Sequence, residues 1–365
     1  MKVLYIVSTL RSCGPTNQLF YIIKNLDPDK FQPSVLTLSP EPDNSEWDKF
    51  QAAKIPVNSL KLSRWQGILF AGSRLKQFVK QYAPQVIHSQ GIRPDTLSAK
   101  CLSGYKRVAT IRNYPFDDYP MKFGKLIGNY SAQRHLRAWQ KIDFPVSCSQ
   151  TINQLITELG VKSQTVRNGV DGDLYRPVNV AEKTQLKQRL NLPLDAKIIV
   201  SAGTLIPRKQ PEMLIKGFLK SQLSKDSILL LLGDGRLRQE CQNLAEGSSN
   251  IRILGQINNV VDYLQVADCF VSASLSEGLP NAAMEALACG VPVCLSDIKP
   301  HREISDLDSN VGVLFPVQDP DALATQLDNL VAARSENNAI AARSLIDNQL
   351  NAVRMSRNYQ QIYLS

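Results

Sequence analysis

The sequence predicts an α/β protein with two doubly wound parallel sheets, and three observations support that fold class. Apolar strand-like runs alternate with helix-like patterns almost from end to end, which is typical of repeated βαβ units. A turn-rich stretch at residues 168–173 interrupts this series, and a second βα series follows it. The chain has 365 residues, about 2.4 times the usual length of one domain, so two compact domains are expected.

The first series predicts an N-terminal Rossmann-like domain. Its opening run is short for a signal peptide, and Arg11 stands where a cleavage site needs a small residue, so we interpret that run as a buried strand. Leu19, Ile22, Ile23 and Leu26 have helical spacing. Helices are expected at residues 17–26 and 69–82, and strands at residues 2–8, 35–38, 85–88, 107–111, 144–147 and 164–167.

The second series predicts a further Rossmann-like domain and a C-terminal helix that crosses back to the first. A polar helix is expected at residues 181–190, a helical tail at 335–365, and strands at 198–202, 227–232, 250–254, 269–273, 291–295 and 312–315. The expected domains are therefore residues 1–170, 171–345 and 346–365. Ligands of open parallel sheets bind beyond the carboxyl ends of the strands, so we expect the active site in a cleft between the domains.

Composition excludes several classes of protein. Hydrophobic residues make up 43% and charged residues 21% of the chain, which excludes intrinsic disorder, and no apolar run approaches the length of a membrane span. Residues 1–160 carry 21 Lys and Arg against 11 Asp and Glu, whereas the remainder carries 21 against 22. The basic half favours an anionic partner such as nucleic acid, acidic lipid or a phosphorylated substrate, although a solvated basic surface explains the composition equally well.

The cysteines and histidines indicate a reducing compartment and no zinc site. The seven cysteines are odd in number and include no CxxC pair, which is typical of buried, reduced thiols in a cytoplasmic protein. None of the three histidines has the spacing of zinc ligands.

The segment from Ser276 to Val293 is the strongest functional signal. It contains two glutamates eight positions apart, Glu277 and Glu285, around a helix that Pro280 can begin and Gly290 can end. Glu277 would precede the helix N-terminus, where free N–H groups attract anions, and Glu285 would lie about two turns into the helix. Each glutamate alone is unexceptional, but the whole segment in this domain plan indicates a ligand site.

This segment resembles the donor-binding signature of the retaining glycosyltransferases of family 4, which have the GT-B fold. Residues 202–210, ending in Arg208-Lys209-Gln210, are similar to the family's diphosphate loop, with Thr204 where the family usually has Arg. Residues 9–17 resemble its glycine-rich loop, with Gly14 retained and Cys13 in place of the first glycine. The resemblance extends over the whole chain through Asn168-Gly169-Val170-Asp171, Gly233-Asp234-Gly235, Leu254-Gly255 and Ala267-Asp268.

The resemblance implies a role for each matching residue. Glu285 would bind the ribose hydroxyls and Glu277 the hydroxyls of the transferred sugar, while Arg208 and Lys209 would stabilise the leaving diphosphate without a metal. We therefore expect Glu277, Arg208 and Lys209 to be catalytic, with no cofactor and no metal, and UDP as the preferred nucleotide. The donor-binding residues would be Gly14, Glu285, Gly278, Leu279, Asn281 and, beside the nucleotide base, Gln256.

The acceptor side is less defined. The family often has a histidine at the end of the strand at 85–88, and the alignment of the strand places it at Gln90, with His88 then buried in the core. We weigh His88 and Gln90 equally as substrate contacts. Arg93, Arg112 and Asn113 also follow strand ends and would suit a phosphate or a carboxylate, or simply lie on the surface. Basic and aromatic residues resemble a membrane-surface patch, with an ordinary amphipathic helix as the alternative: Lys122, Phe123, Lys125, Arg134, His135, Arg137, Trp139 and Lys141.

The expected function is retaining transfer of a hexosyl or N-acetylhexosaminyl group from a nucleotide sugar to a glycan or lipid-linked glycan in surface polysaccharide synthesis. The expected location is the cytoplasm, either free or at the inner face of the cytoplasmic membrane. Two alternatives remain: a sugar-nucleotide epimerase of the same fold, for which we find no acid and base, and a non-enzymatic module that binds membranes or nucleic acid, for which we find no recognition motif.

Overall fold

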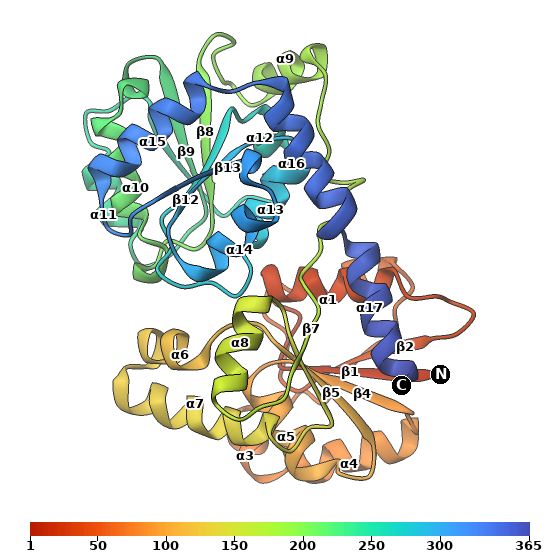
Figure 1. Cartoon of the computed structure of the whole chain (residues 1–365). Coiled ribbons are helices and arrows are strands. Elements are labelled where there is room, and N and C mark those ends of the chain that lie inside the picture. The colour runs from red at the N-terminus through yellow and green to blue at the C-terminus, as the bar shows by residue number, and fades with distance from the viewer. The chain divides into compact units, whose positions relative to one another are not determined.

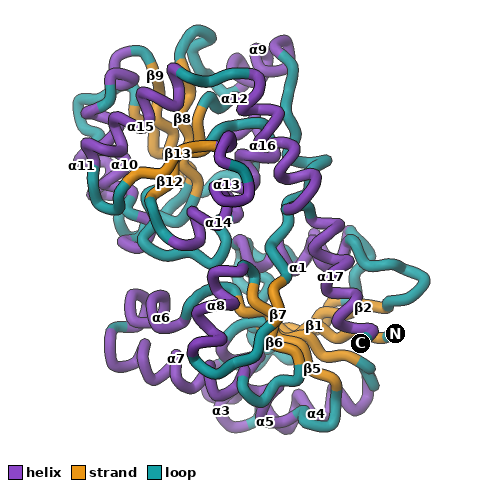
Figure 2. The backbone as a smooth tube through the Cα atoms, in the orientation of Figure 1, coloured by secondary structure: helices purple, strands orange, loops and turns teal.

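The computed structural model divides the chain into two units, one made of Met1–Gly169 with Ala352–Ser365 and the other of Val170–Asn351. It describes the backbone of all 365 residues and every side chain except that of Arg64. Each unit is a parallel sheet with helices on both faces (Figures 1 and 2). The α/β class and the two Rossmann-like domains expected from the sequence are confirmed.

The first unit contains a seven-stranded parallel sheet in the order β3-β2-β1-β4-β5-β6-β7. Its inner strands are buried on both faces because they are nearly continuous apolar runs. The strands are β1 Lys2–Val7, β2 Gln32–Thr37, β3 Val57–Ser59, β4 Val86–Ser89, β5 Lys106–Ile111, β6 Phe144–Ser147 and β7 Gln164–Thr165. The helices are α1 Gly14–Lys24, α2 Trp47–Ala52, α3 Arg64–Leu69, α4 Ala71–Tyr82, α5 Ile92–Cys101, α6 Pro115–Phe123, α7 Lys125–Trp139, α8 Gln150–Glu158 and α17 Ala352–Leu364.

The last helix, α17, belongs to the first unit and packs beside α1 (Figure 1). Ser356 Oγ donates a hydrogen bond to the carbonyl of Ile22 at 2.7 Å. Tyr359 and Tyr363 are fully buried, and their hydroxyls lie 2.8 Å from Thr110 Oγ1 and 3.1 Å from the Tyr5 hydroxyl. The two tyrosines therefore join the C-terminus to the sheet.

The second unit contains a six-stranded parallel sheet in the order β10-β9-β8-β11-β12-β13. The strands are β8 Lys197–Ala202, β9 Ser227–Leu232, β10 Ile251–Gly255, β11 Cys269–Ser272, β12 Val293–Ser296 and β13 Gly312–Phe315. The α-helices are α9 Val180–Arg189, α10 Pro211–Lys220, α11 Arg238–Leu244, α12 Val260–Val266, α13 Asn281–Ala288, α14 Lys299–Leu307, α15 Pro320–Ala332 and α16 Glu336–Gln349. The 3₁₀ turns are η1 Pro207–Lys209, η2 Gln222–Lys225 and η3 Ser309–Val311.

The helical tail differs from the expectation in one respect. We expected the crossing helix from residue 346, whereas α16 continues to Gln349 and residues up to Asn351 belong to the second unit. Arg343 holds α16 there, because its Nη1 donates to the carbonyls of Gly172, Tyr175 and Ala288 at 2.9–3.2 Å. Among the residues that the structure describes, no helix has both the length and the apolarity needed to cross a bilayer.

Candidate active site

Two loops of the second unit meet beyond neighbouring strands. Residues 203–210 follow β8 and residues 273–280 follow β11, which pairs with β8. The backbone N–H of Leu275 donates to the carbonyl of Arg208 at 2.8 Å. Carboxyl ends of parallel strands lie at one edge of a sheet, so the two sequence motifs singled out above come together at that edge.

Glu277, Arg208 and Lys209 form one ionic cluster. Lys209 Nζ contacts Glu277 Oε1, and Arg208 Nη1 lies 3.3 Å from Glu277 Oε2 while also donating to the carbonyl of Ser276. Glu277 is only 9% exposed. Burial by itself would raise the pKa of Glu277, but the charges of Lys209 and Arg208 outweigh it and lower that pKa to about 2. Glu277 is therefore a carboxylate over the whole physiological range.

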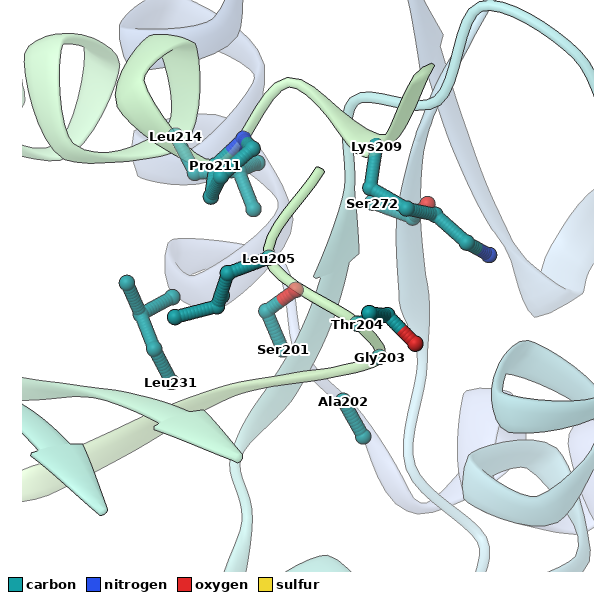
Figure 3. Close-up of a pocket in the computed structure, with 10 residues that line it drawn as sticks. All are labelled: Ser201, Ala202, Gly203, Thr204, Leu205, Lys209, Pro211, Leu214, Leu231 and Ser272. Atoms are coloured by element: carbon teal, nitrogen blue, oxygen red, sulfur yellow. The ribbon is translucent and has the colours of Figure 1, made fainter. Parts of the chain in front are cut away.

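A small pocket lies beside this cluster, at the carboxyl end of β8 (Figure 3). Figure 3 shows the side chains of Lys209 and Thr204 directed to one side of the loop, away from Pro211 and Leu214. The backbone next to the pocket is close-packed, since a Cβ at Gly233 would lie 1.9 Å from the carbonyl oxygen of the lining residue Gly203. The lining residues are Ser201, Ala202, Gly203, Thr204, Leu205, Lys209, Pro211, Leu214, Leu231 and Ser272.

Four of the residues expected to bind the donor lie on or near α13. Gly278 and Leu279 are buried just before the helix, while Asn281 and Glu285 are half-buried on it. Gly290, with φ +72°, follows the C-cap Cys289, as expected of a terminating glycine. Gln256 is exposed beyond the edge strand β10, which β9 and β8 separate from β11, so the structure places it apart from Glu277.

The structure places His301 near Glu277, which the sequence did not predict. It is fully buried in α14, and its Nδ1–H donates to the carbonyl of Ser296 at 2.7 Å, which leaves Nε2 as an acceptor. Among the described atoms, that Nε2 has no hydrogen-bond partner. Burial lowers the pKa of His301 to about 4, although the charge of Glu277 acts in the opposite direction. No spacing rule identifies this residue, because only the fold brings α14 next to the Glu277 loop.

His88 lies in the core, which is one of the two placements that the sequence left open for it. It is 2% exposed, and its Nδ1 and Nε2 lie 2.7 Å from the Tyr363 hydroxyl and from Thr110 Oγ1. Burial lowers the pKa of His88 to about 3, so the ring is neutral. The structure therefore corrects the assignment of His88 as an acceptor contact, because α17 covers it.

Gln90 and Arg112 are joined at the carboxyl edge of the first sheet. Arg112 donates through Nε and Nη2 to Gln90 Oε1 at 3.3 and 3.0 Å, and through Nη1 to Asn168 Oδ1 at 2.6 Å. Gln90 Nε2 donates to the carbonyl of Pro15, next to Gly14 at the start of α1. Gly14, Gln90 and Arg112 thus lie around one edge of the sheet.

Arg93 and Asn113 have separate neighbours. Arg93 Nη1 donates to Ser39 Oγ at 2.7 Å, beyond the end of β2. Asn113 Nδ2 donates to Asp118 Oδ2 at 2.6 Å, at the start of α6. Both side chains are half-buried, and the structure records no direct contact of either with Arg112 among the described side chains.

The basic and aromatic patch expected on residues 122–141 is only partly a surface. His135, Leu136 and Trp139 are buried, whereas Arg134, Arg137 and Lys141 are exposed. His135 Nδ1 lies 2.6 Å from the Tyr119 hydroxyl, and Trp139 Nε1 donates to Asp95 at 3.0 Å. This part of α7 is therefore an amphipathic helix with an exposed basic face, whereas His135 and Trp139 belong to the core.

Comparison with known proteins matches both halves of the chain to families. Residues 14–174 match the model of Glycosyltransferase Family 4, and residues 182–345 match that of Glycosyl transferases group 1. The O-antigen biosynthesis glycosyltransferase WclY of Escherichia coli is 23% identical, with 100% of this chain and 98% of the relative covered. A UDP-Gal:α-D-GlcNAc-diphosphoundecaprenol α-1,3-galactosyltransferase of Escherichia coli is 25% identical, with 80% and 78% covered.

Solved structures share the fold. Sucrose-phosphate synthase from Thermosynechococcus elongatus has a TM-score of 0.85 at 17% identity, with 100% of this chain and 98% of that chain covered. Anabaena HepE in complex with UDP-glucose has a TM-score of 0.82 at 15% identity, with 99% and 98% covered. At these identities the similarity establishes the architecture alone.

Proposed function

The chain belongs to the glycosyltransferases of family 4 and group 1, which have the GT-B fold, and from that premise we propose which reaction it performs. It moves a sugar from a UDP-sugar to a lipid-linked glycan of a surface polysaccharide, with retention of configuration at the anomeric carbon. The observation that carries this proposal is the cluster of Glu277 with Arg208 and Lys209 at the carboxyl edge of the second sheet.

The cluster suits a leaving diphosphate. Negative charge grows on the diphosphate as its bond to the sugar breaks, and fixed cations that already face the site stabilise it without reorganisation. Glu277 holds Arg208 and Lys209 in place and has carboxylate oxygens that can accept hydrogen bonds from sugar hydroxyls. In the retaining reaction, the acceptor hydroxyl attacks from the face that the diphosphate leaves, and a phosphate oxygen takes its proton. The two cations then supply the charge that a metal would otherwise supply.

The relatives support the substrate classes. The name of the galactosyltransferase specifies a UDP-sugar donor and a diphosphoundecaprenol-linked acceptor, and WclY is named for O-antigen biosynthesis. The HepE structure is a complex with UDP-glucose. We carry UDP and a lipid-linked acceptor over to this chain as parts of the proposal.

A panel of UDP-, GDP- and ADP-sugars tests the donor. We expect one UDP-sugar to release UDP, faster with a lipid-linked acceptor, and the rate to persist in EDTA because Arg208 and Lys209 carry the charge. The measurement is nucleotide release together with the anomeric configuration of the product by NMR. Release that EDTA abolishes would contradict metal independence, and an inverted product would contradict retention. An epimerised nucleotide sugar without release would favour the epimerase alternative.

Arg112 is the strongest acceptor-side residue for an anionic group. Its three hydrogen bonds go to amide oxygens of Gln90 and Asn168, and no carboxylate pairs with it in the described part of the chain. A guanidinium without a counter-charge at the carboxyl edge of the sheet suits the phosphate of a diphosphate-linked acceptor. We propose that Arg112 binds this phosphate and that Gln90 orients the guanidinium.

Replacing Arg112 by Gln is expected to raise the KM for the acceptor by about 10- to 100-fold and to leave the KM for the donor unchanged. A charge-assisted hydrogen bond to phosphate contributes roughly 1.5–3 kcal/mol, which corresponds to that range. Steady-state kinetics with each substrate varied in turn is the measurement. Arg74→Gln, on the exposed face of α4, is the control and should change neither constant. An unchanged acceptor KM in Arg112→Gln would remove Arg112 from the acceptor site.

A further inference from the structure

Large apolar side chains are exposed on two neighbouring parts of the first unit. Trp65 on α3 is 79% exposed and Leu126 on α7 is 88% exposed. Soluble monomers rarely expose so many bulky apolar side chains together, and such patches mark interaction sites. We call the following residues the apolar surface: Trp65, Ile68, Leu69, Phe70, Met121, Phe123, Leu126, Ile127 and Tyr130.

Two of the helices that carry the apolar surface, α3 and α7, contact the first turn of α5. On one side, Arg93 packs against α3, where a Cβ at Gly67 would lie 2.2 Å from its Nη2. On the other side, Asp95 Oδ2 lies 2.7 Å from His135 Nε2 and 3.0 Å from Trp139 Nε1, both in α7. Figures 1 and 2 both draw α3 and α7 beside α5. The two parts therefore belong to one side of the unit.

The large apolar side chains of α7 are exposed because other residues already fill the inner face of the helix. Its buried stripe is Gly128, Ala132, His135 and Trp139, at helical spacings of four, three and four. Gly128 lies directly against α6, since a Cβ there would be 2.4 Å from the backbone nitrogen of Pro120. The inner face is thus filled, and the large apolar residues of the first turns point outward.

The outward face of α7 changes from apolar to basic along its length. Leu126 and Tyr130 are followed on the same face by Arg134 and Arg137, at spacings of four, four and three. Lys122 and Lys125 are exposed beside the apolar end. An apolar surface edged by Lys and Arg matches the boundary between the acyl chains and the anionic headgroups of a bilayer.

We propose that the apolar surface inserts into the headgroup boundary of an anionic membrane, with Lys122, Lys125, Arg134 and Arg137 at the lipid phosphates. The inference rests on the proposed lipid-linked acceptor and names the surface that brings the enzyme to it. α3 follows β3 and α6 follows β5, so the apolar surface lies on the same carboxyl side of the sheet as Gln90 and Arg112. A second copy of the chain is a poorer partner, because it would bring two basic rims together.

Flotation with phospholipid vesicles tests the surface on the full chain. We expect the wild type to bind vesicles of phosphatidylcholine with phosphatidylglycerol and to bind pure phosphatidylcholine at least tenfold more weakly. Leu126→Gln with Ile127→Gln should reduce binding at least tenfold, and Lys122→Glu with Lys125→Glu should remove the preference for anionic vesicles. Val180→Gln with Ile340→Gln is the matched control, because both residues are exposed and apolar but lie in the second unit.

Tryptophan emission provides a second readout, since Trp65 is exposed, Trp139 is buried and Trp47 is half-buried. Anionic vesicles should shift the emission to the blue, and Trp65→Phe should abolish the shift. Vesicle binding that is absent, or unaffected by the Leu126 and Ile127 changes, would overturn the proposal. So would a dimer in sedimentation velocity that those changes dissociate. UDP release with a short-chain soluble acceptor is read in parallel, so failure of the membrane surface is distinguishable from failure of the proposed reaction.

Discussion

Replacing Glu277 by Ala is expected to lower the rate of sugar transfer by about 10²–10³-fold, the range seen when one preorganised electrostatic group is removed from an active site. Glu277 is the common partner of Lys209 and Arg208, so its loss removes the carboxylate that positions both cations for the diphosphate. Single-turnover transfer with the donor found in the panel is the measurement. Glu240→Ala, an exposed glutamate on α11, is the control. If the transfer rate falls less than tenfold, the cluster of Glu277, Arg208 and Lys209 has a structural role only.

The charge of Glu277 separates a structural role from an electrostatic one. Glu277→Gln keeps the shape but removes the charge, and we expect it to be nearly as inactive as the alanine variant.

The pKa of Glu277 is lowered from 4.5 to about 2, so its contribution to stability is complete above pH 4.5 and is lost as the pH falls toward 2. This contribution is about 3 kcal/mol, and wild-type stability should therefore fall more steeply than that of Glu277→Gln over this range. Urea unfolding at several pH values measures this difference. If the free energies of unfolding of the wild type and Glu277→Gln fall in parallel with pH, the lowered pKa of Glu277 is contradicted.

Replacing Asp95 by Ala is expected to destabilise the first unit by about 3–5 kcal/mol, the usual cost of removing one partner of a buried polar or ionic pair. Asp95 is fully buried on α5, and its Oδ2 is shared by His135 and Trp139 of α7. His135 in turn lies 2.6 Å from the Tyr119 hydroxyl of α6. The loss of Asp95 leaves the indole N–H and the imidazole without their partner inside the core.

Urea unfolding followed by the fluorescence of Trp139 measures this effect, with Trp47 and Trp65 replaced by Phe. Asp117→Ala, an exposed aspartate on α6, serves as control and should change the free energy of unfolding by less than about 0.5 kcal/mol. A loss of less than about 1 kcal/mol in Asp95→Ala would show that the α5–α7 contact is held by apolar packing alone. Because α7 carries three of the nine residues of the apolar surface, vesicle binding by Asp95→Ala should weaken as well.

The predicted fold agrees closely with the structure because its signals are local. Each buried strand of a parallel sheet is a short apolar run, and the expected strand at residues 144–147 coincides with β6. The strand β3 was not anticipated, since its three residues Val57–Ser59 are only half-buried. The meeting of the loops that carry Arg208 and Glu277 could be predicted too, because the carboxyl ends of parallel strands share one edge of the sheet.

The sequence by itself predicted the two parallel sheets and most of their strands, and its resemblance to a known family pointed to Glu277, Arg208 and Lys209 as candidate site residues. Only the tertiary structure decided their shared ion pairs, the burial of His88 beneath Tyr359 and Tyr363, and the position of His301 near Glu277. It also decided the face of α7, where Trp139 is buried and Leu126 exposed. Periodicity specifies which residues share a face of a helix, whereas the partner of that face comes from segments distant in the chain, and the free energy of packing against them selects it.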